Sequence, residues 1–183
     1  PDSDEDGVLD YEDATPLKTN GPISFIVATY ESDTDITDAI DPYERELERR
    51  GYEYETGYAT DFVQFILLWN GMNRENHDVE NRIAYSYVQE FIVFAHGQSE
   101  AFLFEYCPDP DIYGDLSTIN AMDSYYVTEL LADYYYPPCR IINLDLQACN
   151  CAHEDENGDC IAEVFLNNIP AIENVYAWDG QSI

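Results

Sequence analysis

The side chains best suited to chemistry lie at the very start of the chain, where aspartates alternate with other residues. Aspartates hold the first, third, fifth, ninth and twelfth places of a twelve-residue stretch, and a glycine holds the sixth. Calcium is a hard cation that takes about 6–8 oxygen ligands, many of them from carboxylates. Glycine allows the sharp turn that lets alternate side chains converge on one ion. The stretch therefore predicts a calcium site formed by Asp2, Asp4, Asp6, the carbonyl oxygen of Val8, Asp10 and Asp13.

Two families share this order of ligands. The spacing resembles the EF-hand loop, but Asp13 stands where that loop carries a bidentate glutamate, and no helix precedes the loop in the given sequence. The longer pattern Asp-x-Asp-x-Asp-Gly-Val-x-Asp-x-x-Asp-x-x-Pro, over residues 2–16, is similar to a thrombospondin type 3 calcium repeat. Ala14-Thr15 replaces that family's Asn-Cys, so the disulfide of the repeat is missing. The resemblance implies an extracellular, helix-poor segment and, because such repeats occur in tandem, a chain cut from a longer protein.

The chain is strongly acidic. It carries 38 Asp and Glu against 7 Lys and Arg, for a formal net charge of −31. Because nucleic-acid binding depends on Lys and Arg, this balance excludes nucleic acid as a partner. Three explanations for the charge compete: neutralisation by divalent cations, life in high salt, or a basic partner. No apolar run approaches the roughly 20 residues of a membrane span, so none is expected.

Five cysteines allow several arrangements. An extracellular calcium repeat implies an oxidising compartment, so disulfides are expected, and the odd number leaves one thiol over. Cys149 or Cys151 could pair with Cys160 across a hairpin. Zinc held by these three thiols and His153 is the alternative, although the C-x-C spacing is atypical of structural zinc sites. The cysteines are Cys107, Cys139, Cys149, Cys151 and Cys160.

Patterning predicts a mixed fold. Residues 1–22 form the calcium loop and a linker, and residues 23–183 form a single α+β domain with an antiparallel sheet and a few helices. A β-sandwich with helical insertions is the alternative. The expected strands span 23–30, 142–148 and 160–166, and a β-hairpin is expected over 83–107. One helix is expected to start at Asp41 and a second at Thr60, and a third is expected to cover about 117–133.

An enzyme is not expected from these patterns. There is no G-x-S-x-G and no glycine-rich phosphate loop. His96 lies close to Ser99 and Glu100 in the sequence, but in the turn of the expected hairpin these side chains would point outward. The abundance of acids makes every carboxylate pair a candidate for glycoside chemistry, so none is informative.

The sequence therefore predicts a secreted, calcium-stabilised structural or adhesive module at the cell surface or in the extracellular space. Its expected partners are calcium ions and other copies of itself or another extracellular protein. A carbohydrate-binding module that uses Tyr and Trp faces is one alternative, since 16 residues are tyrosine. A secreted hydrolase that depends on carboxylates is another, and an intracellular protein of a halophile is a third.

Overall fold

The computed structural model describes residues 22–70, 87–106, 111, 114, 119–133, 140–154 and 160–180. The predicted calcium loop lies outside these residues, as do Cys107 and Cys139. In the described part of the chain, no helix is both long and apolar enough to cross a bilayer.

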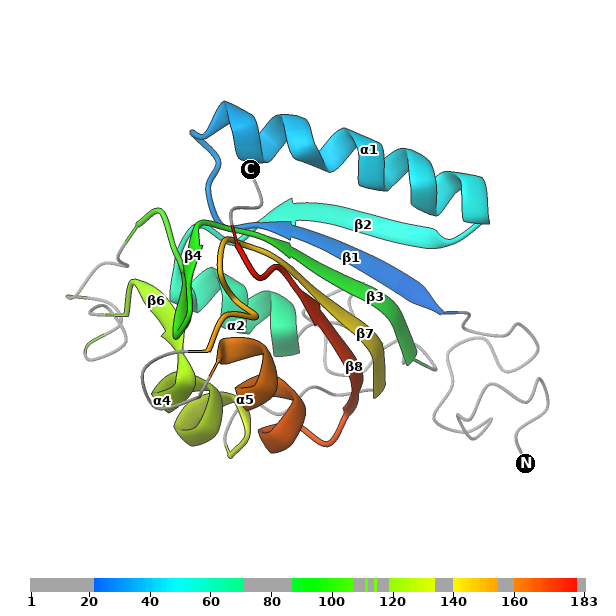
Figure 1. Ribbon diagram of the computed structural model, residues 1–183. Coiled ribbons are helices and arrows are strands. Elements are labelled where there is room, and N and C mark those ends of the chain that lie inside the picture. Colours follow the sequence, from blue (N-terminus) through cyan, green and yellow to red (C-terminus); the bar gives the residue numbers. More distant parts are fainter. Residues whose placement is uncertain are drawn as a thin grey trace.

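The centre of the molecule is a five-stranded sheet in which all neighbouring strands are parallel (Figure 1). In space the strands lie in the order β2-β1-β3-β7-β8. If the five strands are numbered along the chain, their spatial order is 2-1-3-4-5, which is common in doubly wound sheets. The direction in which strands are added reverses between β1 and β3. The strands are β1 (Ile23–Ala28), β2 (Glu53–Tyr58), β3 (Tyr87–Phe94), β7 (Arg140–Gln147) and β8 (Ile172–Ala177).

Of the helices that the structure describes, α1 (Thr34–Arg50) is the only one on its face of the sheet (Figure 1). Asp33 caps its first turn, and Gly51, with φ of 74°, ends it in the left-handed conformation. Its apolar stripe, which includes Ile36 and Ile40, packs on side chains of the central strands β1 and β3, Phe94 among them.

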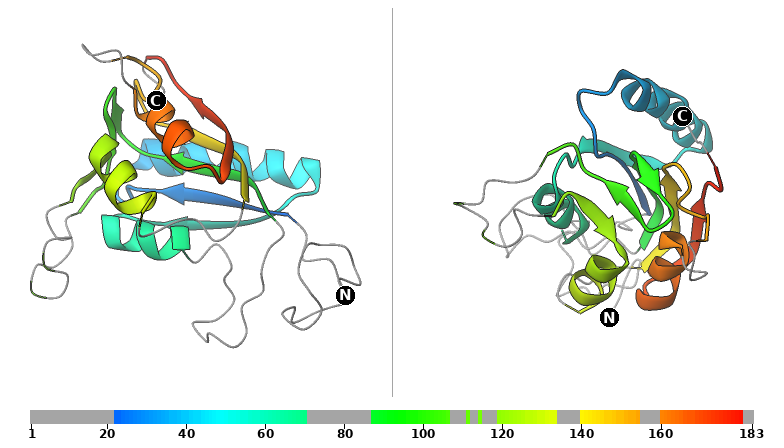
Figure 2. Two further views of the ribbon diagram at one scale, coloured as in Figure 1. Left: turned by 90° about the horizontal axis from the view of Figure 1, so that it is seen from below. Right: turned by 60° about the vertical axis from the view of Figure 1, so that its left-hand side comes forward.

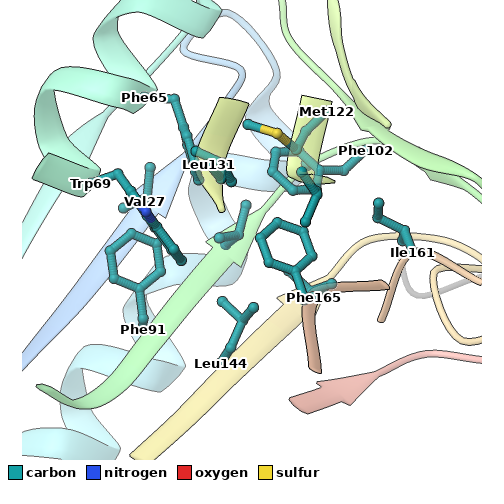
Figure 3. Packing of buried hydrophobic residues seen from close by; sticks show 14 of the residues in the cluster. Val27, Phe65, Trp69, Phe91, Phe102, Met122, Leu131, Leu144, Ile161 and Phe165 are labelled. Carbon is teal, nitrogen blue, oxygen red and sulfur yellow. The ribbon is translucent and has the colours of Figure 1, made fainter. Parts of the chain in front are cut away.

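The opposite face carries the larger core. Helix α2 (Phe62–Asn70), the short helix α4 (Ser124–Tyr126), the π-helix η2 (Val127–Leu131) and helix α5 (Ile161–Asn168) lie on this side of the sheet (Figures 1 and 2). Aromatic rings fill the space between them, as Figure 3 shows for Phe65, Trp69, Phe91 and Phe165. The Trp69 and Phe91 ring centroids are 5.1 Å apart and nearly perpendicular. Burial of this aromatic cluster is the main apolar contribution to stability on this face.

A small antiparallel sheet continues the chain beyond the end of β3. It consists of β4 (Gly97–Gln98), β5 (Ala101–Leu103) and β6 (Ala121–Asp123), in that spatial order. Figure 2 shows these strands at one end of the main sheet. Because β4 starts three residues after β3 ends, the small sheet holds the segment that leaves the carboxyl end of β3.

The α+β class is confirmed, but among the described strands antiparallel pairing is confined to these three short ones. The hairpin expected over 83–107 is wrong, because Tyr87–Phe94 pairs with β1 and β7, and Ala101–Leu103 pairs with β4 and β6. The apolar stretch in β3 is buried along most of its length, which is typical of a strand covered on both faces rather than of a hairpin arm.

Two further expectations about elements are corrected. The return strand expected at 160–166 is helix α5, whose buried residues Ile161, Ala162 and Phe165 have helical spacing. The helix expected to start at Asp41 starts at Thr34 instead, because Asp33 caps it, and Pro42 lies inside it. A proline nine positions into a helix lacks an N–H, so the helix tolerates one missing hydrogen bond there.

Candidate catalytic site

Three side chains with catalytic chemistry follow the carboxyl ends of neighbouring parallel strands. Asp33 follows β1, His96 follows β3 and Cys149 follows β7. Phe94 and Gln147 are register partners at the ends of β3 and β7, so His96 and Cys149 each come two residues further on. The Ala95 N–H donates to the Gln147 carbonyl at 3.3 Å, which extends the pairing beyond the strands. The sheet thus brings the imidazole-bearing and thiol-bearing segments together.

Gly97 shows how closely these two segments lie. An ideal Cβ at this position would lie 2.7 Å from the Cys149 carbonyl oxygen, 2.8 Å from the Cβ of Ala148 and 3.0 Å from the Sγ of Cys151. Any larger residue would push the chain after β3 away from the chain after β7. Glycine is therefore required here for close approach, and the His96-Gly97 segment is packed directly against the cysteine segment.

His96 is paired with Asp33. Its Nε2 lies 2.8 Å from Oδ2 of Asp33, and the Tyr30 ring meets the imidazole edge-on with centroids 4.6 Å apart. The hydrogen bond to His96 lowers the pKa of Asp33, and the N–H groups of Asp35 and Ile36, which donate to its carboxylate, lower it further. An ionised Asp33 holds the proton of a neutral imidazole on Nε2, which leaves the lone pair on Nδ1.

The loop that carries Asp33 is anchored to the segment after β5. The Thr29 hydroxyl donates to the Leu103 carbonyl at 2.7 Å, and the Glu105 N–H donates to the Thr29 carbonyl at 3.1 Å. The Glu105 carboxylate accepts hydrogen bonds from the Glu31 N–H at 2.6 Å and from Ser32. These contacts fix the chain on the approach to Asp33, so the carboxylate is placed by backbone anchors as well as by its role as a helix cap.

The turn that carries Cys149 is held from the other side. Asn150 has φ of 58°, the only positive φ of a non-glycine residue in the described ranges, and asparagine tolerates this conformation better than most residues. The Asn150 N–H donates to the Gly180 carbonyl at 2.7 Å, and the Ala152 N–H donates to the Trp178 carbonyl at 2.9 Å. The segment after β8 therefore fixes the sharp turn next to the thiol. Unusual backbone conformations of this kind are concentrated at functional sites.

Cys149 is the accessible thiol among the three cysteines that the structure describes. Cys149 is partly exposed, whereas Cys151 and Cys160 are buried. Burial, with smaller contributions from the neighbouring Cys149 and Cys160, raises the pKa of Cys151 to about 12. A buried thiol with a raised pKa is a poor nucleophile, so only Cys149 has the exposure that reaction with a substrate requires.

A second histidine–aspartate pair lies near by but differs in its surroundings. His153 Nδ1 is 2.8 Å from Oδ1 of Asp179, the same separation as in the first pair. Both side chains are largely exposed, at 62% and 70%. His153 and Asp179 also follow the carboxyl ends of two neighbouring strands, β7 and β8, whereas Asp33 and His96 follow β1 and β3, where the strand order reverses. The side chains of Asp33 and His96 are less exposed, at 27% and 48%.

The predicted metal sites are not found at this edge. Asp2, Asp4, Asp6, Val8, Asp10 and Asp13 lie outside the described residues, so the calcium site stays a prediction. Within the ranges given above, no three or more His, Cys, Asp or Glu side chains are grouped to hold a metal. That includes the thiols and imidazole considered for zinc at Cys149, Cys151, His153 and Cys160.

The close approach of the segments that carry His96 and Cys149 was missed by sequence reasoning, although a signal for it is present. Gln147-Ala148-Cys149 matches the Q-A-C that ends in the nucleophilic cysteine in the local signature of caspases, whose histidine lies about 50 residues upstream, as His96 does here. Asn150 and Cys151 depart from that signature, which continues with Arg, Gln or Gly and then Gly. Such local signatures do not transfer between families, so the match adds support only alongside the geometry.

No family model matches the chain, and neither a curated protein nor a solved structure is similar to it.

Proposed function

We propose that this protein is a cysteine-dependent hydrolase of peptide-type amide bonds, with Cys149 as nucleophile, His96 as general acid and base, and Asp33 as the residue that positions the imidazole. The observation that carries the proposal is the register of the sheet. It brings the segment of a histidine already paired with an ionised carboxylate next to the segment of a partly exposed cysteine. A nucleophile, a base and a group that orients the base form the usual arrangement of covalent catalysis.

In this mechanism, Nδ1 of His96 takes the proton of the Cys149 thiol as Sγ attacks the carbonyl carbon of the substrate. The proton passes from His96 to the leaving amine as the amide C–N bond breaks, which leaves an acyl group on Sγ. His96 then takes a proton from water, whose oxygen attacks the thioester, and returns that proton to Sγ as the acid product leaves. Asp33 stabilises the imidazolium in both halves of the cycle.

The position of the site in the fold supports the same proposal. In open parallel sheets, ligands bind outside the carboxyl ends of the strands where the strand order reverses. Here the order reverses between β1 and β3, and the paired side chains of Asp33 and His96 follow those two strands. Small adjustments of the loops at this edge can then bring the substrate carbonyl to the thiol without any change in the sheet.

The charge of the chain bears on the substrate. With a net charge of −31, the protein attracts cationic molecules and repels anionic ones before contact. We therefore expect peptides with basic residues to be preferred over acidic ones, and the preference to weaken as salt is added, because screening shortens the reach of surface charges.

The test uses two probes on the full chain. Iodoacetamide measures the reactivity of each thiol, with the modified cysteine located by mass spectrometry. A library of blocked tripeptides carrying a fluorogenic amide leaving group measures hydrolysis. We expect Cys149 to be alkylated first, and any amide hydrolysis to disappear in Cys149→Ala while it persists in Cys160→Ala.

Two controls keep the result specific. His96→Ala should slow both alkylation of Cys149 and hydrolysis, whereas His153→Ala, which removes the other paired histidine, should leave both unchanged. Equal reactivity of Cys149 in the wild type and His96→Ala would refute the assigned pairing. Hydrolysis that survives in Cys149→Ala would place the chemistry elsewhere in the chain.

A second proposal comes from the sequence of the N-terminal loop, and it concerns stability and location rather than catalysis. Calcium bound by Asp2, Asp4, Asp6, Asp10 and Asp13, with the Val8 carbonyl oxygen, would offset part of the negative charge and order residues 1–22 in an extracellular setting. A structural or adhesive role, with assembly into oligomers, extends this proposal. Calorimetric titration with calcium, compared between wild type and Asp6→Asn, tests it; no difference in affinity between the two would remove the loop as the site.

A further inference from the structure

A cavity of about 310 Å³ lies on the face of the sheet that carries α1, away from the candidate catalytic site. Its walls come from the second half of α1 and from strands β3, β7 and β8. Its volume is at the lower end of the range for small-molecule sites, which suits a small ligand. The residues that line it are Tyr43, Glu46, Leu47, Arg50, Glu90, Ile92, Asn143, Asp145 and Tyr176.

The floor of this cavity is polar, which is unusual for the inside face of a parallel sheet. Such faces are normally covered by helices and lined with apolar residues. Here Asn143 donates to Glu90 at 3.2 Å, and the Gln147 amide donates to the Asp145 carboxylate at 2.7 Å. The Trp178 indole N–H donates in turn to the side-chain amide oxygen Oε1 of Gln147 at 2.6 Å. These hydrogen bonds hold the floor in a fixed arrangement without covering it.

The charges that line the cavity do not balance. Three carboxyl groups, those of Glu46, Glu90 and Asp145, face one guanidinium, that of Arg50. Arg50 is already paired with Glu46 at 2.9 Å and with Glu90 at 3.3 Å. Among the described residues, no basic side chain forms an ion pair with Asp145. The cavity therefore holds a carboxylate that lacks a counter-ion.

Burial increases the energetic cost of leaving the Asp145 carboxylate without a counter-ion. It raises the pKa of Asp145 to about 6, with a further contribution from the nearby Glu90. It also raises the pKa of Tyr43 to about 12, again with a contribution from Asp145. Both shifts have the cause expected where negative charge is held in a partly desolvated site without a cation beside it.

The lining favours an organic cation over a metal ion. Calcium needs about 6–8 oxygen ligands. In the described ranges, the three carboxyl groups of the cavity included, no three acidic, histidine or cysteine side chains are grouped so that they could hold a metal ion. Tyr43 and Tyr176 add aromatic rings and Leu47 adds an aliphatic wall, which a hydrated metal ion does not use. Carboxylates combined with aromatic rings are the usual surroundings of bound ammonium and guanidinium groups.

We propose that this cavity binds a small organic cation, an alkylammonium or guanidinium group, with Asp145 as its counter-ion and Tyr43 and Tyr176 beside it. The cation is either a free amine or the side chain of a basic residue in a peptide, since both present the same chemistry. The proposal is independent of the assignment of Cys149 and His96.

The test is calorimetric titration of the full chain at pH 8 with agmatine, a free amine with a guanidinium group, and with acetyl-arginine amide, the peptide-like arm. Acetyl-citrulline amide has nearly the same shape without the charge and serves as the neutral control. We expect one site that binds at least one of the two cations, and no binding of the citrulline compound. Asp145→Asn should weaken binding at least tenfold, whereas Asp38→Asn, which removes the same charge from the exposed side of α1, should not.

The pH dependence sharpens the test. Binding should weaken from pH 8 to pH 5, because Asp145 and Glu90 both have raised pKa values and take up protons. Glu46 keeps its charge, since its pKa is held at about 2 by Arg49 and Arg50. Arg50 and Tyr43, whose pKa values are raised, keep their protons throughout.

Three results would overturn the proposal. Equal loss of affinity in Asp145→Asn and Asp38→Asn would mean that the cation follows the overall charge of the protein rather than the cavity. Binding of the citrulline compound as tight as that of the arginine compound would mean that the cavity does not select charge. Failure of both cations to bind, or their displacement by millimolar calcium or magnesium in an Asp145-dependent way, would also exclude an organic-cation site.

Discussion

Two aspartates of this protein show how the same side chain can be prepared for opposite tasks. Asp33, at the carboxyl edge of the sheet, accepts hydrogen bonds from His96 and from two backbone N–H groups, which lower its pKa. Asp145, on the α1 face of the sheet, is desolvated and lies near Glu90, which raise its pKa to about 6. Hydrogen-bond donors of the protein stabilise the negative charge of Asp33. At Asp145 a bound cation would have to stabilise it.

The difference shows what separates an orienting group from a binding group. A carboxylate whose acceptors are filled by the fold can hold an imidazole in one orientation, but it has little left to offer a ligand. A carboxylate that is buried without a cation gains most from a ligand that supplies one. Opposite pKa shifts of like groups are a general way to distinguish roles in a site, and four experiments test the distinction here.

The largest effect on hydrolysis is expected for His96, the proposed general base. His96→Ala should lower hydrolysis of the fluorogenic peptides by roughly 10²- to 10⁴-fold, the usual contribution of a general acid–base group. His153→Ala removes a histidine with an equally short contact to an aspartate and should have no such effect. The measurement is kcat/KM for both variants, and similar values for the two would erase the distinction between the two pairs.

The next effect concerns stability at Asp145. Its folded pKa of about 6 lies above the unfolded value, so its protonated form stabilises the fold below about pH 4, and this stability is lost as the pH rises through 6. The shift corresponds to about 3 kcal/mol. Asp145→Asn should therefore be more stable than wild type at pH 8, by up to this amount, and equal to it near pH 4. Urea unfolding at both pH values measures this, and a variant less stable at pH 8 would contradict the described environment.

Gly97→Ala tests the close approach of the segments that carry His96 and Cys149. The added Cβ would meet backbone and side-chain atoms at 2.7 to 3.0 Å, so the chain after β3 must move. Overpacking of this kind costs about 1–3 kcal/mol. We expect a loss of stability near 2 kcal/mol and a slower reaction of Cys149 with iodoacetamide. Gly57→Ala, in edge strand β2, has open space for its Cβ and serves as the control.

The smallest effect is expected at Asp33. Asparagine keeps the helix cap, because it caps nearly as well as aspartate, but it removes the charge that faces His96. Loss of one charge-assisted hydrogen bond of about 1.5 kcal/mol corresponds to about a tenfold decrease in kcat/KM. The stabilisation that Asp33 gives the wild type is present above its unfolded pKa and is lost as the pH falls. The variant should therefore be less stable than the wild type at pH 7, and this difference should shrink towards pH 3. Asp179→Asn should change neither quantity.

Sequence patterning identified single elements better than their arrangement. The strand near 23–30, the helix after Thr60 and the strand near 142–148 were predicted close to where they lie, because local periodicity and burial agree there. The parallel pairing of β1 with β3 joins segments about 60 residues apart, and no local signal encodes which strand will be the neighbour.

The candidate site was missed for the same reason. A hairpin interpretation of 83–107 placed His96 at an exposed turn, whereas parallel pairing places it at the carboxyl end of a central strand. The Q-A-C tripeptide was present throughout, but without the topology Cys149 was one of five similar cysteines. The calcium loop, the clearest signal in the sequence, lies outside the described residues and bears on neither of the two sites described in the structure.

The sheet order also sets when the thiol can first react. Asp33 and His96 can form their contact once β1 and β3 have paired. The segment that carries Cys149 comes next to them only after β7 has been synthesised and has paired with the far side of β3. Pairings between distant segments form late, because the entropy cost of closing a long loop comes before the contacts that offset it. The order of the strands therefore completes the proposed catalytic site only when β7 has paired with β3, later than the contact between Asp33 and His96.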